Sequence, residues 1–179
     1  MRMANQAKLH SFRTAPVHMY GHLVPRNHDQ AIEIDKQNGN TRWQDAEKEE
    51  LSAILGYGTF NDLGKGASAP VGHKKINVHF VYACKHDGRY KARLVAGGHL
   101  TDTPIDSVYS SVASLRGVRM TVFLAELNGC EFLSTDIGNA YLESNTMEKV
   151  YIIVGKEFAC VGLEGHVLVI IKALYGLKS

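Results

Sequence analysis

Alternating apolar and polar side chains predict a β-hairpin in the middle of the chain. The pattern runs through residues 76–84 and again through residues 90–96, on either side of Asp87-Gly88. A period of two places successive side chains on opposite faces of a strand, so each run has one apolar face. The apolar positions are Ile76, Val78, Phe80, Tyr82 and Cys84, then Tyr90, Ala92, Leu94 and Ala96.

The turn decides which side chains share a face of this hairpin. A two-residue Asp-Gly turn would put apolar residues of the first strand beside Lys91 and Arg93. A three-residue loop over residues 86–88, with Gly88 left-handed, keeps every apolar residue on one face. The pattern therefore favours the three-residue loop, and it places Lys91 and Arg93 together on the solvent-facing side.

Two helices are predicted ahead of the hairpin. Asn27 followed by Gln30 is typical of a capping box, and that helix is expected to stop at Asn38-Gly39. Thr41 is the expected cap of the second helix, which Gly56 ends. Apolar residues recur on one face of the second helix: Trp43, Ala46, Leu51, Ile54 and Leu55.

The second half of the chain predicts one more helix and several strands. The helix starts at Ser110 or Ser111 and runs to Asn128, with Gly129 as its stop. Its expected buried stripe is Val112, Leu115, Val118, Val122 and Ala125. Strands are expected at 131–137, 150–154 and 167–171, with a short turn or helix at 139–143. Helices and strands without strict alternation indicate an α+β fold.

Composition narrows the class of protein. About 45% of the 179 residues are hydrophobic, enough for a core. No run reaches the length of a membrane span, and no apolar run follows the basic N-terminus as in a signal peptide. Three distant cysteines indicate reduced thiols rather than a disulfide framework or a zinc site. We therefore expect an intracellular protein, cytoplasmic or nuclear, in which Cys130 and Cys160 are core thiols.

The net charge of +2 conceals an uneven distribution. Residues 65–100 carry seven Lys or Arg and one acid, Asp87, whereas the flanking stretches 29–51 and 131–164 are acidic. A basic segment between acidic ones fits a local polyanion-binding surface. Charge alone favours the simpler alternative of a solvated, lysine-rich hairpin.

The segment 134–142, Ser-Thr-Asp-Ile-Gly-Asn-Ala-Tyr-Leu, carries the most chemical information. Asp136 ends a predicted apolar strand, and a glycine-containing turn then presents Tyr141. A carboxylate at a strand end can hold a divalent metal ion, while the turn backbone approaches a phosphate. An aspartate before a turn is more often a cap, so this segment alone decides nothing.

Four motifs occur together in a recognisable order: residues 90–96 (YKARLVA), 134–142 (STDIGNAYL), Val150-Tyr151, and 172–178 (KALYGLK). In this order and spacing they resemble the reverse transcriptases of copia-type retrotransposons. The helix pattern at 42–51 is similar to the one that precedes that domain. Residues 1–26 show no clear periodicity and are expected to form a poorly structured arm, followed by a helical lead-in over 27–56. The resemblance implies fingers with a partial palm over 57–179. The fold implied is a truncated right-hand polymerase, with a fingers β-hairpin and a mixed or antiparallel palm sheet packed by helices.

The resemblance also implies roles for individual residues. Asp136 matches the first catalytic aspartate, a ligand of two Mg²⁺ ions, and the backbone carbonyl of Ile137 completes a metal site. Tyr141 matches the gate that excludes a 2′-hydroxyl. The remaining matches are Gly138, Asn139 and Ala140 as the turn around the triphosphate and ribose, Lys91 and Arg93 as phosphate-binding fingers residues, and Tyr175, Gly176, Leu177 and Lys178 as support for the template and base. Without the resemblance, Tyr141 would be a packing residue and Lys91 and Arg93 surface charges.

The same resemblance implies a template-primer of RNA or DNA and a deoxynucleotide as partners, with no membrane. The family's Y-x-D-D motif is missing, because no two aspartates are adjacent in this sequence. We therefore expect part of an RNA-directed DNA polymerase, with the rest of a polyprotein missing, that does not polymerise by itself. The alternative is an inactive transposon-derived remnant that binds nucleic acid weakly at most.

Overall fold

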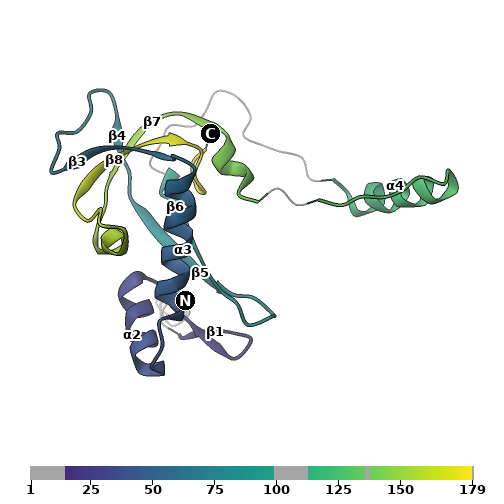
Figure 1. The fold of residues 1–179 in the computed structure, drawn as a ribbon, viewed down its shortest axis with the longest axis horizontal. Helices are drawn as coiled ribbons and strands as arrows, with labels where there is room; N and C mark the ends of the chain where they lie inside the picture. The colour runs from purple at the N-terminus through teal and green to yellow at the C-terminus, as the bar shows by residue number, and fades with distance from the viewer. Residues whose placement is uncertain (1–14, 99–112, 136–137, 179) are drawn as a thin grey trace, which may run out of the picture.

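A computed structural model describes residues 15–98, 113–135 and 138–178 of the chain (Figure 1). A mixed sheet lies at one end of the molecule, and helix α2 (His28–Asn38) and the hairpin of β1 (Val17–Met19) and β2 (His22–Val24) lie at the other. Helix α3 (Arg42–Gly56) connects the two ends (Figure 1). Helices and sheets follow one another without regular alternation. The expected α+β class is confirmed at this level.

Helix α2 spans His28–Asn38 and has the predicted ends. The Asn27 side chain accepts a hydrogen bond from the Gln30 N–H at 2.9 Å. Gly39 closes the helix in a left-handed conformation, φ 63°. The helix buries Ala31, Ile34 and Asp35.

Helix α3 spans Arg42–Gly56 and is capped by a residue other than the predicted one. The Thr41 hydroxyl donates to Asp45, 2.8 Å away, and caps no backbone group. The buried carboxylate of Asp35 instead accepts from the N–H groups of Trp43 and Gln44 at 3.0–3.1 Å. A carboxylate here satisfies N–H groups that have no partner within the helix. Asp35 thus ties α2 to the start of α3.

The central hairpin has the predicted register. Strands β5 (Val78–Cys84) and β6 (Tyr90–Ala96) pair antiparallel, with Tyr82 opposite Ala92 and Phe80 opposite Leu94. The Lys85 N–H donates to the Arg89 carbonyl, which leaves residues 86–88 as the loop, and Gly88 has φ 80°. The prediction of a three-residue loop is confirmed, and β6 ends at Ala96, where the alternating pattern also ends.

A second, four-stranded mixed sheet has the strand order β3-β8-β7-β4. Strands β7 (Asn145–Ile153) and β8 (His166–Lys172) pair antiparallel; β8 contains the predicted strand 167–171, and β7 overlaps the predicted strand 150–154 but starts earlier and ends one residue sooner. Strand β3 (Phe60–Lys65) joins β8 at one edge, and the two-residue β4 (Lys74–Lys75) runs parallel to β7. Neither β3 nor β4 was predicted, because edge strands with so few buried side chains show only a weak alternation of apolar and polar residues. Short helices η2 (Ala140–Glu143) and η3 (Lys156–Val161) flank β7.

Two short strands lie in the segment expected to be an arm. β1 (Val17–Met19) pairs with β2 (His22–Val24) across a turn in which Tyr20 and Gly21 both have positive φ. Paired positive φ values match the two-residue turns that join twisted strands. Three-residue strands are too short to show a period, so the pattern could not reveal them.

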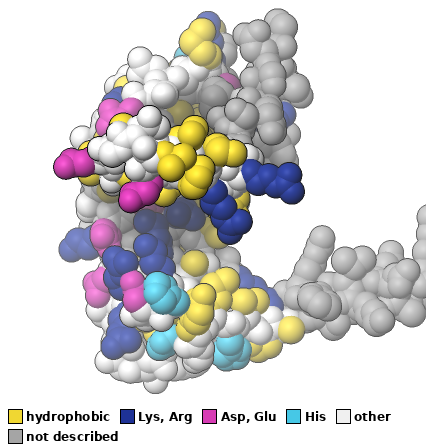
Figure 2. All heavy atoms as spheres, turned by 90° about the vertical axis from the view of Figure 1, so that its right-hand side faces the viewer, with side chains coloured by type: hydrophobic (Ala, Val, Ile, Leu, Met, Phe, Trp, Pro, Cys, Tyr) yellow, Lys and Arg dark blue, Asp and Glu magenta, His cyan; other side chains and the backbone are white. Residues whose placement is uncertain are grey.

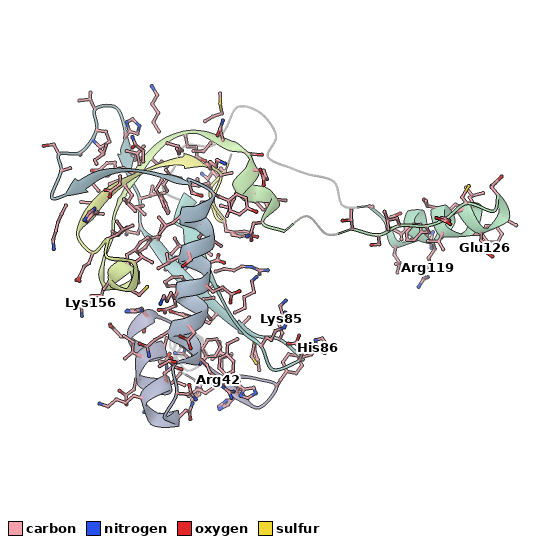
Figure 3. All side chains as sticks on the ribbon, viewed as in Figure 1. Arg42, Lys85, His86, Arg119, Glu126 and Lys156 are labelled. Carbon is pink, nitrogen blue, oxygen red and sulfur yellow. The ribbon has the colours of Figure 1, made fainter. Side chains whose placement is uncertain are left out.

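Helix α4 spans Leu115–Leu127, and its expected buried stripe is exposed. Leu115, Val118 and Val122 are 64%, 44% and 41% exposed. Ser114 caps the helix and Gly129 ends it with φ 61°, whereas Ser110, Ser111 and Val112 lie outside the described residues. Figures 1 and 3 show α4 away from the other elements, with Arg119 and Glu126 on it. The amphipathic pattern correctly predicted a helix here, but none of the other described residues covers its apolar face.

Two further expectations are corrected. Residues 131–135 form no strand, because a strand requires a neighbouring strand to bond its backbone, and none of the described strands pairs with them. Cys130 and Cys160 are exposed rather than core thiols, and only Cys84 of the three is buried. Cys130 directly follows the exposed α4, and Cys160 lies on η3.

Candidate nucleotide-binding site

The two predicted cations lie side by side on β6. Lys91 is opposite Ala83 and Arg93 is opposite Val81, on the face of the hairpin away from the buried Tyr82 and Leu94. Arg93 is exposed and Lys91 is half-buried. This arrangement matches the predicted solvent-facing pair.

Helix α3 places an acid beside these cations. A Glu50 oxygen accepts a hydrogen bond from the Leu94 N–H at 3.2 Å. Burial raises the pKa of Glu50, and this hydrogen bond and the charges of Lys91 and Arg93 oppose that rise. The cations are therefore partly balanced within the protein, which the pattern of charges along the sequence did not reveal.

A pocket of about 180 Å³ brings Lys91 together with Asn139. The pocket lies between α3, β6 and the turn before η2, and Lys85 and Arg89 of the hairpin also line it, with Glu49 and Glu50 opposite. Figure 2 shows Lys and Arg side chains gathered around a hollow on this side of the molecule. The basic segment of the sequence thus lines a concave surface, though acids of α3 share it.

Tyr141 is presented on η2, two residues beyond Asn139. Asn139 has φ 53°, a left-handed conformation that asparagine tolerates better than most residues. Its carbonyl accepts from the Leu142 N–H at 2.8 Å, and Leu142 is buried. Tyr141 itself is 57% exposed. Leu142 therefore anchors the short helix while Tyr141 faces outward.

The C-terminal segment 175–178 lies against the end of β6. The Tyr175 carbonyl accepts from the Ala96 N–H at 2.7 Å, and a Glu148 oxygen accepts from the Lys178 N–H at 2.9 Å. Leu177 packs against the main core. Gly176 has φ 91°. Four residues predicted to support template and base are thus fixed next to the predicted fingers strand.

Two glycines permit this close approach. A Cβ atom on Gly98 would lie 1.9 Å from the Gly176 carbonyl oxygen, and one on Gly176 would lie 2.2 Å from the Ala96 carbonyl oxygen. Both distances are far below van der Waals contact. A glycine pair directly after a strand is a signal of close backbone approach that the sequence offered.

The ring of Tyr175 contacts two of the other predicted residues. The Arg93 guanidinium carbon lies 5.6 Å from the centre of this ring. The rings of Tyr175 and Tyr141 have centroids 5.1 Å apart and are tilted by 48°. The structure therefore brings Arg93, Tyr141 and Tyr175 into one cluster, next to the pocket that holds Lys91 and Asn139.

The predicted metal ligands of this chain are Asp136 and Ile137. Asp136 and Ile137 lie outside the described residues, while their neighbours Gly138 and Ala140 are described and exposed. Within the described ranges, no three His, Cys, Asp or Glu side chains gather as a metal site would require.

Comparison with known proteins now identifies the family. Residues 63–179 match the model of the family described as reverse transcriptase (RNA-dependent DNA polymerase). The chain belongs to this reverse transcriptase family. The matched part contains β6, the turn before η2 and the C-terminal segment, which together form the cluster and the pocket.

Two relatives place this member of the family with the copia-type retrotransposons. The retrovirus-related Pol polyprotein from transposon TNT 1-94 of Nicotiana tabacum is 30% identical over 141 residues, which cover 75% of this chain and 10% of that protein. The retrovirus-related Pol polyprotein from transposon RE1 of Arabidopsis thaliana is 30% identical over 146 residues, which cover 77% of this chain and 10% of that protein. The chain thus spans about a tenth of the length of these relatives.

No solved structure matches this chain. Reverse transcriptases as a family use divalent metal ions. Among the described residues, none of the helices is long and apolar enough to cross a membrane.

Proposed function

We propose that this chain supplies the nucleotide-binding part of an RNA-directed DNA polymerase. The observation that carries the proposal is the cluster of Arg93, Tyr141 and Tyr175 beside the pocket of Lys91 and Asn139. Cations on one strand face suit a triphosphate, because charge-assisted hydrogen bonds to phosphate are strong. In this proposal residues 57–179 belong to the fingers and partial palm, and residues 27–56 form a helical lead-in.

Each predicted residue takes its role in this proposal. Lys91 and Arg93 bind the phosphates, and Gly138, Asn139 and Ala140 form the turn around triphosphate and ribose. Tyr141 lies beneath the sugar and excludes a 2′-hydroxyl. Tyr175, Gly176, Leu177 and Lys178 support the template strand and the base.

We propose Mg²⁺ as the metal, with the Asp136 carboxylate and the Ile137 carbonyl as the ligands this chain contributes. Oxygen ligands of this kind suit a small, hard cation. Bound Mg²⁺ would stabilise charge that develops during phosphoryl transfer. Two-metal sites need several carboxylates, and no adjacent aspartates occur in this sequence. We therefore propose that the chain binds a deoxynucleotide but does not extend a primer, and that a template-primer and the rest of a polyprotein complete the site.

Calorimetric titration with dATP and Mg²⁺ tests the proposal. The variants Lys91→Ala and Arg93→Ala are expected to weaken binding about tenfold each, as expected for loss of a charged hydrogen bond. Lys156→Ala, on η3, is the control and should leave binding unchanged. Equal affinity in all four proteins would contradict the proposal. Primer extension on poly-rA/oligo-dT above an Asp136→Ala control would contradict the expected inactivity.

The match to reverse transcriptases supports this proposal over that of a transposon-derived remnant without a polymerase role. Nucleic-acid binding separates the two further. If Lys91 and Arg93 contact phosphates, affinity should fall steeply with salt, and the slope should flatten when both are neutralised.

A further inference from the structure

The ring of Tyr175 joins two side chains that have few other constraints. Arg93 is exposed on the outer face of β6, and Tyr141 is 57% exposed on a helix of four residues. Long or exposed side chains of this kind sample many rotamers unless a neighbour restricts them. The Tyr175 ring lies within contact range of both.

Tyr175 is itself held from both sides along the backbone. Its carbonyl accepts from Ala96, and the adjacent Leu174 is buried in the core. On the other side, Gly176 packs against the backbone of residues 96–98. A residue fixed in this way can orient its less constrained neighbours.

Packing of the core does not account for the Tyr175 ring. Leu174 belongs to the main core cluster and Leu177 packs against it, whereas Tyr175 belongs to neither core cluster of the described residues. The ring is half-exposed, and the contacts recorded for it are with Arg93 and Tyr141. Replacing the ring should therefore leave the fold intact, because no cavity opens in the core.

We propose that Tyr175 is a positioning residue. Its ring contacts both the Arg93 guanidinium and the Tyr141 ring, and so fixes the orientation of each. The proposal rests on the proposed function, because Arg93 and Tyr141 are the groups that would receive the nucleotide. In this arrangement Tyr175 couples phosphate binding on β6 to exclusion of the 2′-hydroxyl on η2. Its action is through these two side chains rather than on the reacting atoms.

Two substitutions separate the ring from the hydroxyl. Tyr175→Phe keeps an aromatic face for the cation and for the Tyr141 ring. Tyr175→Leu keeps apolar volume but removes the ring. Tyr57→Leu is the matched control, because Tyr57 also receives a cation, the Lys172 ammonium 5.9 Å from its ring centre, on a different part of the chain.

The first measurement is the NMR signal of the Arg93 Nε–H group in the nucleotide-free chain. A neighbouring ring shifts this proton, so the signal should move in Tyr175→Leu and stay nearly unchanged in Tyr175→Phe and Tyr57→Leu. An unmoved signal in Tyr175→Leu would overturn the positioning role, whatever the nucleotide experiments give.

The second measurement compares the affinities for dATP and ATP, which differ only at the 2′ position, with Mg²⁺ present. Tyr175→Leu should weaken dATP binding about three- to tenfold and reduce the preference for dATP over ATP. Tyr175→Phe should keep the affinity and the preference of the unsubstituted chain. If Tyr175 had only a structural role, its replacement would weaken the binding of dATP and of ATP by the same factor. A preference unchanged in Tyr175→Leu overturns the proposal. Failure of the unsubstituted chain to bind either nucleotide overturns the proposed function, while the Arg93 signal still reports on the contact.

Discussion

Helices α3 and α4 have similar lengths and similar amphipathic patterns, but they differ in what covers them. α3 buries Trp43, Leu51 and Ile54 almost completely, between α2, the hairpin and η3. α4 buries none of its residues, and Phe123 is 58% exposed. The pattern of side chains was sufficient to predict both helices. Burial depended on a partner, and the described part of the chain supplies one only to α3.

The described parts of the proposed site resemble α3 in this respect. β6 and the C-terminal segment are fixed against α3 and the core, so their side chains have definite neighbours. The segment that follows α4 contains Asp136, which lies outside the described residues. The described half of the proposed site is therefore built from anchored elements.

A matched pair of leucines tests the comparison most severely. Leu51→Ala on α3 should cost about 2–5 kcal/mol, because Leu51 is fully buried and its removal leaves a cavity. Leu124→Ala on α4 should change stability by less than about 0.5 kcal/mol, because Leu124 is 49% exposed. Urea denaturation followed by circular dichroism measures both. Equal losses would show that α4 is packed as firmly as α3.

The glycine contact tests the anchoring of the C-terminal segment. Gly98→Ala should cost about 1–3 kcal/mol, because the added methyl meets the Gly176 backbone and one of the two segments must move. Gly56→Ala, where nothing lies within 4 Å of the added carbon, should be neutral or stabilising. Denaturant midpoints of the two variants give the comparison. A Gly98→Ala protein as stable as Gly56→Ala would mean that the segment is not held there.

The buried side of α3 should make stability depend on pH. Burial raises the pKa of Glu47 above its usual 4.5, and hydrogen bonds from Tyr82 and contacts with His28 offset this only in part. Folded Glu47 therefore holds its proton to a higher pH than the unfolded chain does. Its contribution to stability is present below about pH 4.5 and is lost as the pH rises through the folded value.

Glu47→Gln removes this titration while keeping a similar shape. Relative to the unsubstituted protein, the variant should gain stability as the pH rises through that window, by at most about 1.4 kcal/mol per pH unit. Thermal unfolding across the acidic range measures the difference. A difference between the two proteins that stays constant with pH would contradict the account of Glu47.

The half-buried Glu50 of α3 should have the smallest effect. Glu50→Gln removes a negative charge beside Lys91 and Arg93 while an amide oxygen can still accept from Leu94. Affinity for dATP with Mg²⁺ should rise about two- to fivefold, because a partly exposed charge pair is worth little. Glu126→Gln on α4 is the control and should leave affinity unchanged. Weaker binding in Glu50→Gln would mean that the carboxylate assists the site.

Local patterns predicted the parts of the fold that local physics determines. The period of two fixed the hairpin register, and Asn27 and Gly39 fixed the ends of α2. Features that depend on distant residues were missed. Asp35 caps α3 from the preceding helix, and Glu47 is buried among groups from α2 and β5, although a charged residue is expected to be solvated.

The candidate site was predictable only as a set of motifs. The order and spacing of the motifs predicted site roles for Lys91, Arg93, Tyr141 and Tyr175. No pattern within a single motif could show that Arg93, Tyr141 and Tyr175 form one cluster. The contact through Tyr175 requires the chain to fold back over β6, which the Gly98–Gly176 approach permits. Glu50 was missed because its relation to the cations arises from the packing of α3 on β6.

The central claim is that β6, the turn before η2 and the C-terminal segment form one nucleotide-binding surface. Titration of isotope-labelled chain with dATP and Mg²⁺, followed by NMR, tests it most directly. The account predicts that the perturbed signals cluster at Lys91, Arg93, Asn139 and Tyr141, while those of α4 stay unchanged. Perturbations that avoid these residues, or that fall mainly on α4, would contradict it.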